Sequence, residues 1–160
     1  MLSAFAVFVH AQDVTKATAT LEPKSGSQVT GTVTFAKSGD EVQVVADVQN
    51  LKPGKHGFHI HEKGDCSAPD AMSAGGHFNP MHEHHGGPDS VERHAGDFGN
   101  ITVDASGKGH LDWKGKLKFS GAESIIGKSV IVHEKEDDLK TDPSGNSGAR
   151  IACGVIEAAK

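Results

Sequence analysis

Apolar and polar side chains alternate with a period of two residues in several segments of this chain of 160 residues. In segments 17–21 and 29–35, most of the polar positions are threonines. Because successive side chains of a strand point to opposite faces, this pattern predicts half-buried β-strands. Similar reasoning predicts further strands at 42–48, 56–61, 97–103, 110–117, 129–133 and 151–156.

Turn-forming residues separate these segments at 24–26, 38–40, 52–54, 104–107 and 121. No 12-residue stretch carries a helical apolar stripe, and the length suits one domain. The sequence therefore predicts an all-β fold, an antiparallel sandwich or barrel of about eight strands. Two long segments, 62–96 and 134–148, are rich in Gly, Pro, Asp and His, which indicates functional loops.

Charge and hydropathy exclude two classes of partner. The net charge is -5 and no basic run is present, which argues against nucleic-acid binding. The apolar run at 2–9 is too short for a bilayer, which needs about 20 residues, and no other stretch qualifies, so no membrane span is expected.

The same apolar run ends in Val9-His10-Ala11, which places small residues at the two positions that a signal peptidase recognises. We expect residues 1–11 to be an export signal and residues 12–160 to form a single domain. No Lys or Arg precedes the apolar run, so the signal is either truncated upstream or has an unusual start. An apolar first strand is the alternative interpretation. The only two cysteines, Cys66 and Cys153, predict one disulfide in an exported chain; two buried free thiols are the alternative.

Histidine is concentrated in the middle of the chain, and two of the residues form a His-x-His pair on a predicted strand. Alternation places both rings of such a pair on one face. Downstream residues complete a set of seven candidate metal ligands: His59, His61, His77, His85, His94, Asp97 and His133. Two four-coordinate sites need eight donors, unless one imidazole bridges both cations; His77 could serve as that bridge.

Six motifs carry a resemblance to a known family: GFHIHE at 57–62, GHFNP at 76–80, HGGP at 85–88, RHAGDFGN at 93–100, VIVHEK at 130–135 and GARIACGV at 148–155. In order and spacing, from about residue 16 to 156, the chain resembles the copper/zinc superoxide dismutases. The run GDCSAPD at 64–70 is similar to bacterial members. The resemblance implies an eight-stranded antiparallel Greek-key sandwich or barrel.

Position by position, the resemblance implies two metal sites. The copper ligands would be His59, His61, His77 and His133. The zinc ligands would be His77, His85, His94 and Asp97. An all-imidazole set suits Cu(II), and a tetrahedron of histidines and one aspartate suits a structural Zn(II).

Two further roles are implied by the family. Asp137 would join a ligand of each metal, and Arg150 would hold the anionic substrate beside copper. The disulfide could clamp the Arg150 segment against the metal-binding loop. The segment 137–150 is shorter than in many eukaryotic members and keeps few cations, chiefly Lys140, and Ser144 stands where the family has a channel threonine.

The implied activity is disproportionation of two superoxide anions to O2 and H2O2, with copper cycling between Cu(II) and Cu(I) and His77 carrying a proton. A non-catalytic copper- and zinc-binding or metal-delivery module on the same fold is the alternative, and an adhesive sandwich domain is a more distant one. The expected location is periplasmic or extracellular. A homodimer is compatible with the resemblance, but the sequence does not define its interface.

Three other histidines near the site are not assigned as ligands. His82 and His84 crowd His85, and we choose His85 for zinc because Gly86-Gly87-Pro88 follows it. The other two are expected to be solvated, or alternatively to collect metal before the site is filled. His56 is expected to be a hydrogen-bonded neighbour of the site.

Overall fold

The computed structural model describes residues 13–160, and among these it contains nine β-strands and one single-turn 3-10 helix. The helix, η1, is Met72–Ala74, so no helix in this part of the chain has the length or the hydropathy to span a membrane. The strands are β1 Lys16–Pro23, β2 Thr30–Ser38, β3 Glu41–Gln49, β4 Gly54–His61, β5 Asp97–Val103, β6 Gly109–Gly115, β7 Ser129–His133, β8 Arg150–Val155 and β9 Glu157–Ala158.

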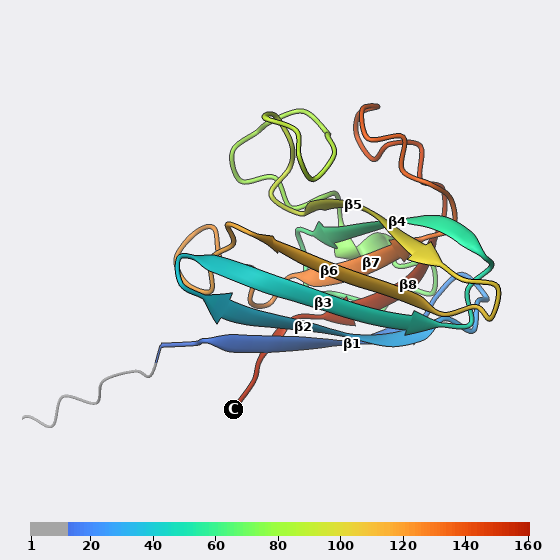
Figure 1. Ribbon diagram of the computed structural model, residues 1–160, viewed down its shortest axis with the longest axis horizontal. Helices are drawn as coiled ribbons and strands as arrows, with labels where there is room; N and C mark the ends of the chain where they lie inside the picture. The colour runs from blue at the N-terminus through green and yellow to red at the C-terminus, as the bar shows by residue number, and fades with distance from the viewer. Residues whose placement is uncertain (1–12) are drawn as a thin grey trace, which may run out of the picture.

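Eight of the strands form a closed antiparallel barrel (Figure 1). Its order is β2-β3-β6-β5-β4-β7-β8-β1, and β1 also pairs with β2. The β3–β4 and β6–β7 connections each pass over two strands, which makes the topology Greek-key. The predicted eight-stranded fold is confirmed. The two-residue β9, which pairs with β1, was not predicted because two residues are too few to show a period.

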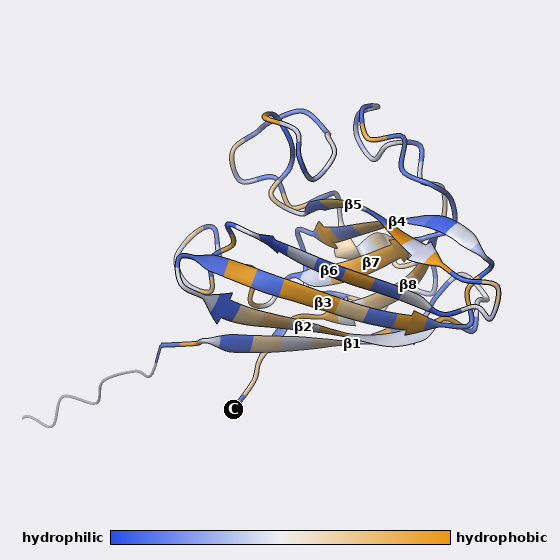
Figure 2. Cartoon of the chain, viewed as in Figure 1, coloured by the Kyte–Doolittle hydropathy of each residue, from blue (hydrophilic) through white to orange (hydrophobic). Residues whose placement is uncertain are grey.

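The predicted strands 97–103 and 129–133 coincide with β5 and β7, and the other six differ from the structure by at most three residues at an end. Apolar and polar positions alternate toward both ends of β3 (Figure 2), with Val45 an additional apolar residue in the middle, and the burial of the strand keeps a period of two throughout. All five predicted turns contain a glycine with positive φ: Gly26, Gly39, Gly54, Gly107 and Gly121.

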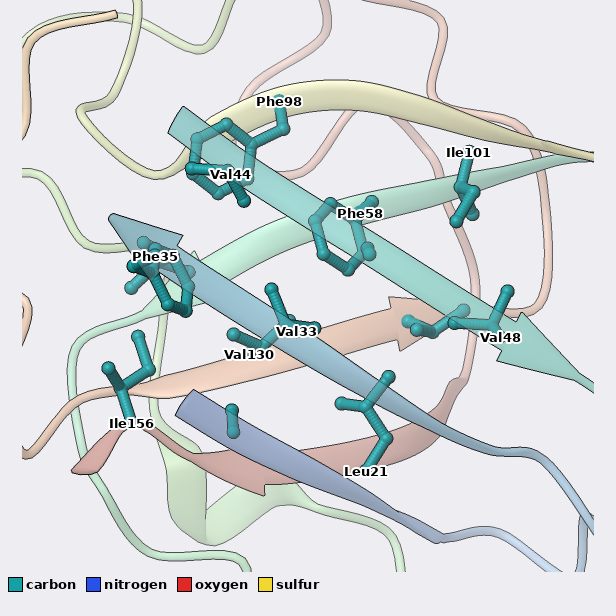
Figure 3. Close-up of a cluster of buried hydrophobic side chains, with 14 of the residues drawn as sticks. Leu21, Val33, Phe35, Val44, Val48, Phe58, Phe98, Ile101, Val130 and Ile156 are labelled. Carbon is teal, nitrogen blue, oxygen red and sulfur yellow. The ribbon is translucent and has the colours of Figure 1, made fainter. Parts of the chain in front are cut away.

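The barrel interior is filled by apolar side chains from both halves of the sheet (Figure 3). Phe35 and Phe58 are fully buried, and the ring of Phe58 lies 5.7 Å from that of Phe98, centroid to centroid. Removing a buried ring of this size costs about 3–5 kcal/mol in other proteins. This rigid core fixes β4, whose opposite face carries the histidines.

The later part of the first long loop, 62–96, and the loop 134–148 stand above the β4 and β5 side of the barrel (Figure 1), whereas the earlier part of the first loop, with η1, lies beside β8. A disulfide between Cys66 and Cys153 ties the first loop to β8 across 87 positions of sequence, as predicted. The segment 1–11, expected to be an export signal, lies outside the described residues.

Candidate metal centre

β4 supplies the first two imidazoles. Phe58 and Ile60 point into the core, while His59 and His61 project from the other face with their ring centroids 6.3 Å apart. Both rings are buried because the two loops cover this face. An isolated bridge between His61 and His77 brings the first loop alongside the strand.

A group of four buried histidines forms where β4, β7 and the first loop meet: His59, His61, His77 and His133, referred to below as the four-histidine group. The His77 centroid lies 4.0 Å from that of His59 and 4.8 Å from that of His61, and His133 lies 4.7 Å from His59. In each ring one nitrogen is buried without a partner: Nδ1 of His59 and Nε2 of the other three. Buried polar atoms are normally satisfied, so four convergent nitrogens without partners fit the donor set of a bound cation.

The opposite nitrogens of three of these rings are held by hydrogen bonds. His61 Nδ1 donates to the Gly75 carbonyl at 2.8 Å, and His133 Nδ1 donates to the Gly148 carbonyl at 3.3 Å. His59 Nε2 lies 2.6 Å from Asp137 Oδ2. Such partners fix the tautomer and leave the lone pair of the other nitrogen facing the centre of the group.

A second buried group consists of His77, His85, His94 and Asp97, referred to below as the three-histidine-aspartate group. Its three ring centroids are nearly equidistant, at 5.2, 5.3 and 5.4 Å. His77 Nδ1 lies 2.8 Å from Asp97 Oδ1 and 3.2 Å from His94 Nδ1. His85 Nδ1 comes within 3.0 Å of Asp97 Oδ2 but has no hydrogen-bond partner. Three imidazoles and one carboxylate around one point match a tetrahedral zinc donor set.

His77 belongs to both groups. Its orphaned Nε2 accompanies the orphans of the four-histidine group, whereas its Nδ1 contacts Asp97 and His94. One imidazole therefore faces two clusters through its two nitrogens, which is the arrangement that the count of seven donors favours.

Asp137 connects the two groups from behind. Its buried carboxylate contacts His59 Nε2 through Oδ2 and His85 Nε2, at 2.8 Å, through Oδ1. Asn100 on β5 holds the Asp137 backbone, donating to its carbonyl at 3.0 Å and accepting from its N–H at 2.7 Å. Gly145, with a φ of +65°, lies directly over the carboxylate, where an added Cβ would collide with Asp137 Oδ1. The sequence analysis identified Asp137 but missed Asn100 and Gly145.

The electrostatics of the two groups differ. Burial is the main cause that lowers the pKa of each histidine in the four-histidine group, for His77 to about 3, so these rings are neutral and ready to bind a cation. Burial also opposes charging of His85, but its contacts with Asp137 and Asp97 outweigh that effect and raise its pKa to about 9. Despite their burial, the pKa values of both carboxyls are held below the usual range by hydrogen bonds from histidines.

Arg150, at the start of β8, pairs with His133 across the β7–β8 ladder. Its guanidinium donates to the Ala71 carbonyl at 3.0 Å. Its charge contributes to lowering the pKa values of His61 and His133, as expected for a cation facing the four-histidine group. The disulfide and this hydrogen bond both attach the Arg150 segment to the first loop.

The remaining histidines lie outside both groups. His56 is buried, and its ring contacts the carbonyls of His133 at 2.9 Å and Lys52 at 2.8 Å, which confirms its prediction as a hydrogen-bonded neighbour. His82 is exposed. His84 is also exposed, but its ring contacts Asp142 at 2.6 Å, a partner that the sequence analysis did not anticipate.

Known proteins match this chain over most of its length. A family model described as copper/zinc superoxide dismutase matches residues 29–156. The chain is 46% identical over 140 residues to an extracellular superoxide dismutase [Cu-Zn] of Caenorhabditis elegans, covering 83% of this chain and 63% of that protein, so it spans less than two thirds of that relative. An extracellular superoxide dismutase [Cu-Zn] of Drosophila melanogaster is 46% identical over 139 residues, covering 81% of this chain and 76% of that protein.

A third relative, superoxide dismutase [Cu-Zn] 4 of Dictyostelium discoideum, is 45% identical over 140 residues, covering 82% of this chain and 92% of the relative. Among solved structures, a crystal structure of the clock protein EA4 aligns with a TM-score of 0.84 and 39% identity, covering 94% of this chain and 99% of that one. The family match and the relatives agree with the two groups of ligands: this chain belongs to the copper/zinc superoxide dismutase family.

Proposed function

We propose that this protein is a superoxide dismutase, which converts two superoxide anions and two protons into O2 and H2O2. The observation that carries the proposal is the shared imidazole of His77, with one nitrogen among the orphans of the four-histidine group and the other in the three-histidine-aspartate group. A structural zinc site alone does not need a second cluster joined to it through one ring.

The donor chemistry assigns the cations. The four-histidine group, His59, His61, His77 and His133, would hold copper, because an all-imidazole set suits Cu(II). The three-histidine-aspartate group, His77, His85, His94 and Asp97, would hold zinc with no open position, and hence in a structural role. Bound copper supplies one-electron exchange with superoxide, in both directions.

The protein's own residues bind the anion and supply a proton. Arg150 keeps its charge at any physiological pH and lies beside the four-histidine group, so its guanidinium can bind superoxide there. His77 is held through Nδ1 on the zinc side, which leaves Nε2 as the atom that takes up and releases a proton. Asp137 fixes His59 and His85 so that the donor sets keep their orientation.

Attraction of the anion has to overcome the net charge of -5. Superoxide dismutases are themselves a known example of local fields that steer a substrate. Here the segment 138–149 contains one cation, the exposed Lys140, and Ser144 supplies a hydroxyl in the same loop. We therefore assign most of the local positive field to Arg150.

Export is part of the proposal. Two of the relatives are named as extracellular, and a disulfide is typical of oxidising compartments. A cleaved signal at 1–11, a domain at 12–160, a periplasmic destination, a bacterial type and a homodimer stay predictions.

The test is reconstitution of the full chain with one copper and one zinc, followed by a superoxide-removal assay. The expected result is activity far above that of free copper at the same concentration, falling as salt screens the field around Arg150. A protein that binds copper tightly and removes superoxide no faster than free copper would contradict the proposal and support a metal-delivery module instead.

A further inference from the structure

We propose that Asp142 is a positioning residue for His85, the ligand through which the second long loop controls the zinc site. The inference rests on the proposed function only in that it takes the three-histidine-aspartate group to be the zinc site. It assigns a role to a carboxylate that the sequence analysis did not single out.

One carboxylate contacts two consecutive residues of the other loop. Asp142 Oδ1 accepts a hydrogen bond from the His85 backbone N–H at 2.7 Å, and Asp142 Oδ2 lies 2.6 Å from His84 Nδ1. The side chains of His84 and Asp142 are 77% and 49% exposed, whereas His85 is buried. The contact therefore joins the solvent-exposed side of the first long loop, 62–96, referred to below as the zinc-site loop, to the loop 134–148.

The same loop already holds the other end of His85, because Asp137 Oδ1 contacts its Nε2 at 2.8 Å. A ring held at one atom alone can pivot about that atom. With the backbone N–H held by Asp142 as well, both ends of the residue are fixed, and the orphaned Nδ1 is directed toward Asp97. Asp142 thus sets the direction of the donor atom without touching the cation.

The neighbouring Asp138 offers a matched control. It is a capping carboxylate of the same loop, and it accepts hydrogen bonds from the Thr141 N–H and hydroxyl, the Lys140 N–H and the Asn146 amide. All these partners lie in its own loop. Asp138→Ala therefore loosens the loop without removing a bond to the zinc-site loop, whereas Asp142→Ala removes two.

The two bonds of Asp142 are separable. The exposed pair with His84 should contribute little, as surface ion pairs generally do. The bond to the His85 N–H is the part expected to matter. Asp142→Asn keeps a carbonyl oxygen for that N–H, so it should rescue the site, and His84→Ala should leave the site nearly intact.

The experiment measures zinc affinity of the full chain by competition with a chromophoric chelator, with copper affinity measured in parallel. Asp142→Ala should weaken zinc binding by about 10- to 100-fold, as loss of a ligand-supporting hydrogen bond does in other metal sites. His84→Ala, Asp142→Asn and Asp138→Ala should each stay within about fivefold of the wild type. The absorption spectrum of Co(II) bound in place of zinc should change in Asp142→Ala alone, because only there does His85 reorient.

Three outcomes overturn the inference. Zinc affinity of Asp142→Ala equal to that of the wild type shows that the bond does not position His85. Equal losses in Asp142→Ala and Asp138→Ala show that the loop acts only as a whole. A wild-type chain that binds no zinc overturns both this inference and the proposed function, whereas the first two outcomes leave the proposed function standing.

Discussion

Replacing Asp137 with asparagine tests how the two groups are joined. The carboxylate accepts from His59 Nε2, from His85 Nε2 and from the Leu139 N–H. An amide of the same shape has only one oxygen, and its NH2 group opposes whichever imidazole N–H it faces. In either orientation at least one buried ring nitrogen loses its acceptor.

The expected magnitude follows from that count. A buried donor left without a partner costs about 1–3 kcal/mol, so the free energy of unfolding of the metal-free protein should fall by about that amount. Zinc affinity should fall about 10- to 100-fold, since a partner that orients a ligand is removed.

The pH dependence has a definite sign. Asp137 contributes to raising the pKa of His85 to about 9, above its unfolded value of 6.5. The stabilisation from this pair is therefore fully present below pH 6.5 and is lost as the pH rises through about 9. The Asp137→Asn loss should be larger at pH 6 than at pH 10.

The assay is urea unfolding of the metal-free chain at both pH values, with chelator competition for zinc and with Asp138→Asn as the exposed control from the same loop. An equal loss of stability at the two pH values, or unchanged zinc affinity, would show that Asp137 does not join the two groups through His85.

Four other predictions concern Arg150, the disulfide, the buried histidines and Gly145. Arg150→Ala should lower the rate constant for superoxide removal by about 10-fold or more, while elemental analysis shows unchanged copper and zinc contents. Loss of copper from this variant would contradict the prediction. Replacing both Cys66 and Cys153 with alanine should lower the free energy of unfolding by about 4.5 kcal/mol in a denaturant titration, and a loss below about 1 kcal/mol would count against the clamp. Burial lowers the pKa values of the histidines in the four-histidine group, so below about pH 6.5 the unfolded chain binds protons that the native chain does not bind. The urea midpoint of the metal-free protein should therefore fall as the pH drops below about 6.5. A midpoint that does not change with pH would exclude this cause. Gly145→Ala, which drives a methyl group into the Asp137 carboxylate, should weaken zinc binding as measured with a chelator, and wild-type affinity would show that the loop yields without cost.

Much of the fold could be predicted because strand periodicity is a local property. The alternation along β1, for example, is visible in the sequence and again in its burial. Strand ends were less certain: the predicted strand 110–117 continues past Gly115, where pairing with β3 stops. That end depends on the partner strand, which the local pattern does not contain.

The candidate site divides in the same way. The seven donors have distinctive side chains, and their order matches a family, so they could be named from sequence. Asp142 and Gly145 carry no such signal, and Asn100 lies inside a family motif without a side chain that points to a role. Their importance lies in contacts between segments far apart in the chain. His84 looked like a solvated histidine for the same reason: its partner is 58 positions away.

Anomalous diffraction from crystals of the metal-loaded protein, recorded at the copper and zinc absorption edges, would locate both cations relative to His77. We expect one copper peak within the four-histidine group and one zinc peak within the three-histidine-aspartate group, with the ring of His77 between them. A single peak, or two peaks that His77 does not join, would contradict this arrangement.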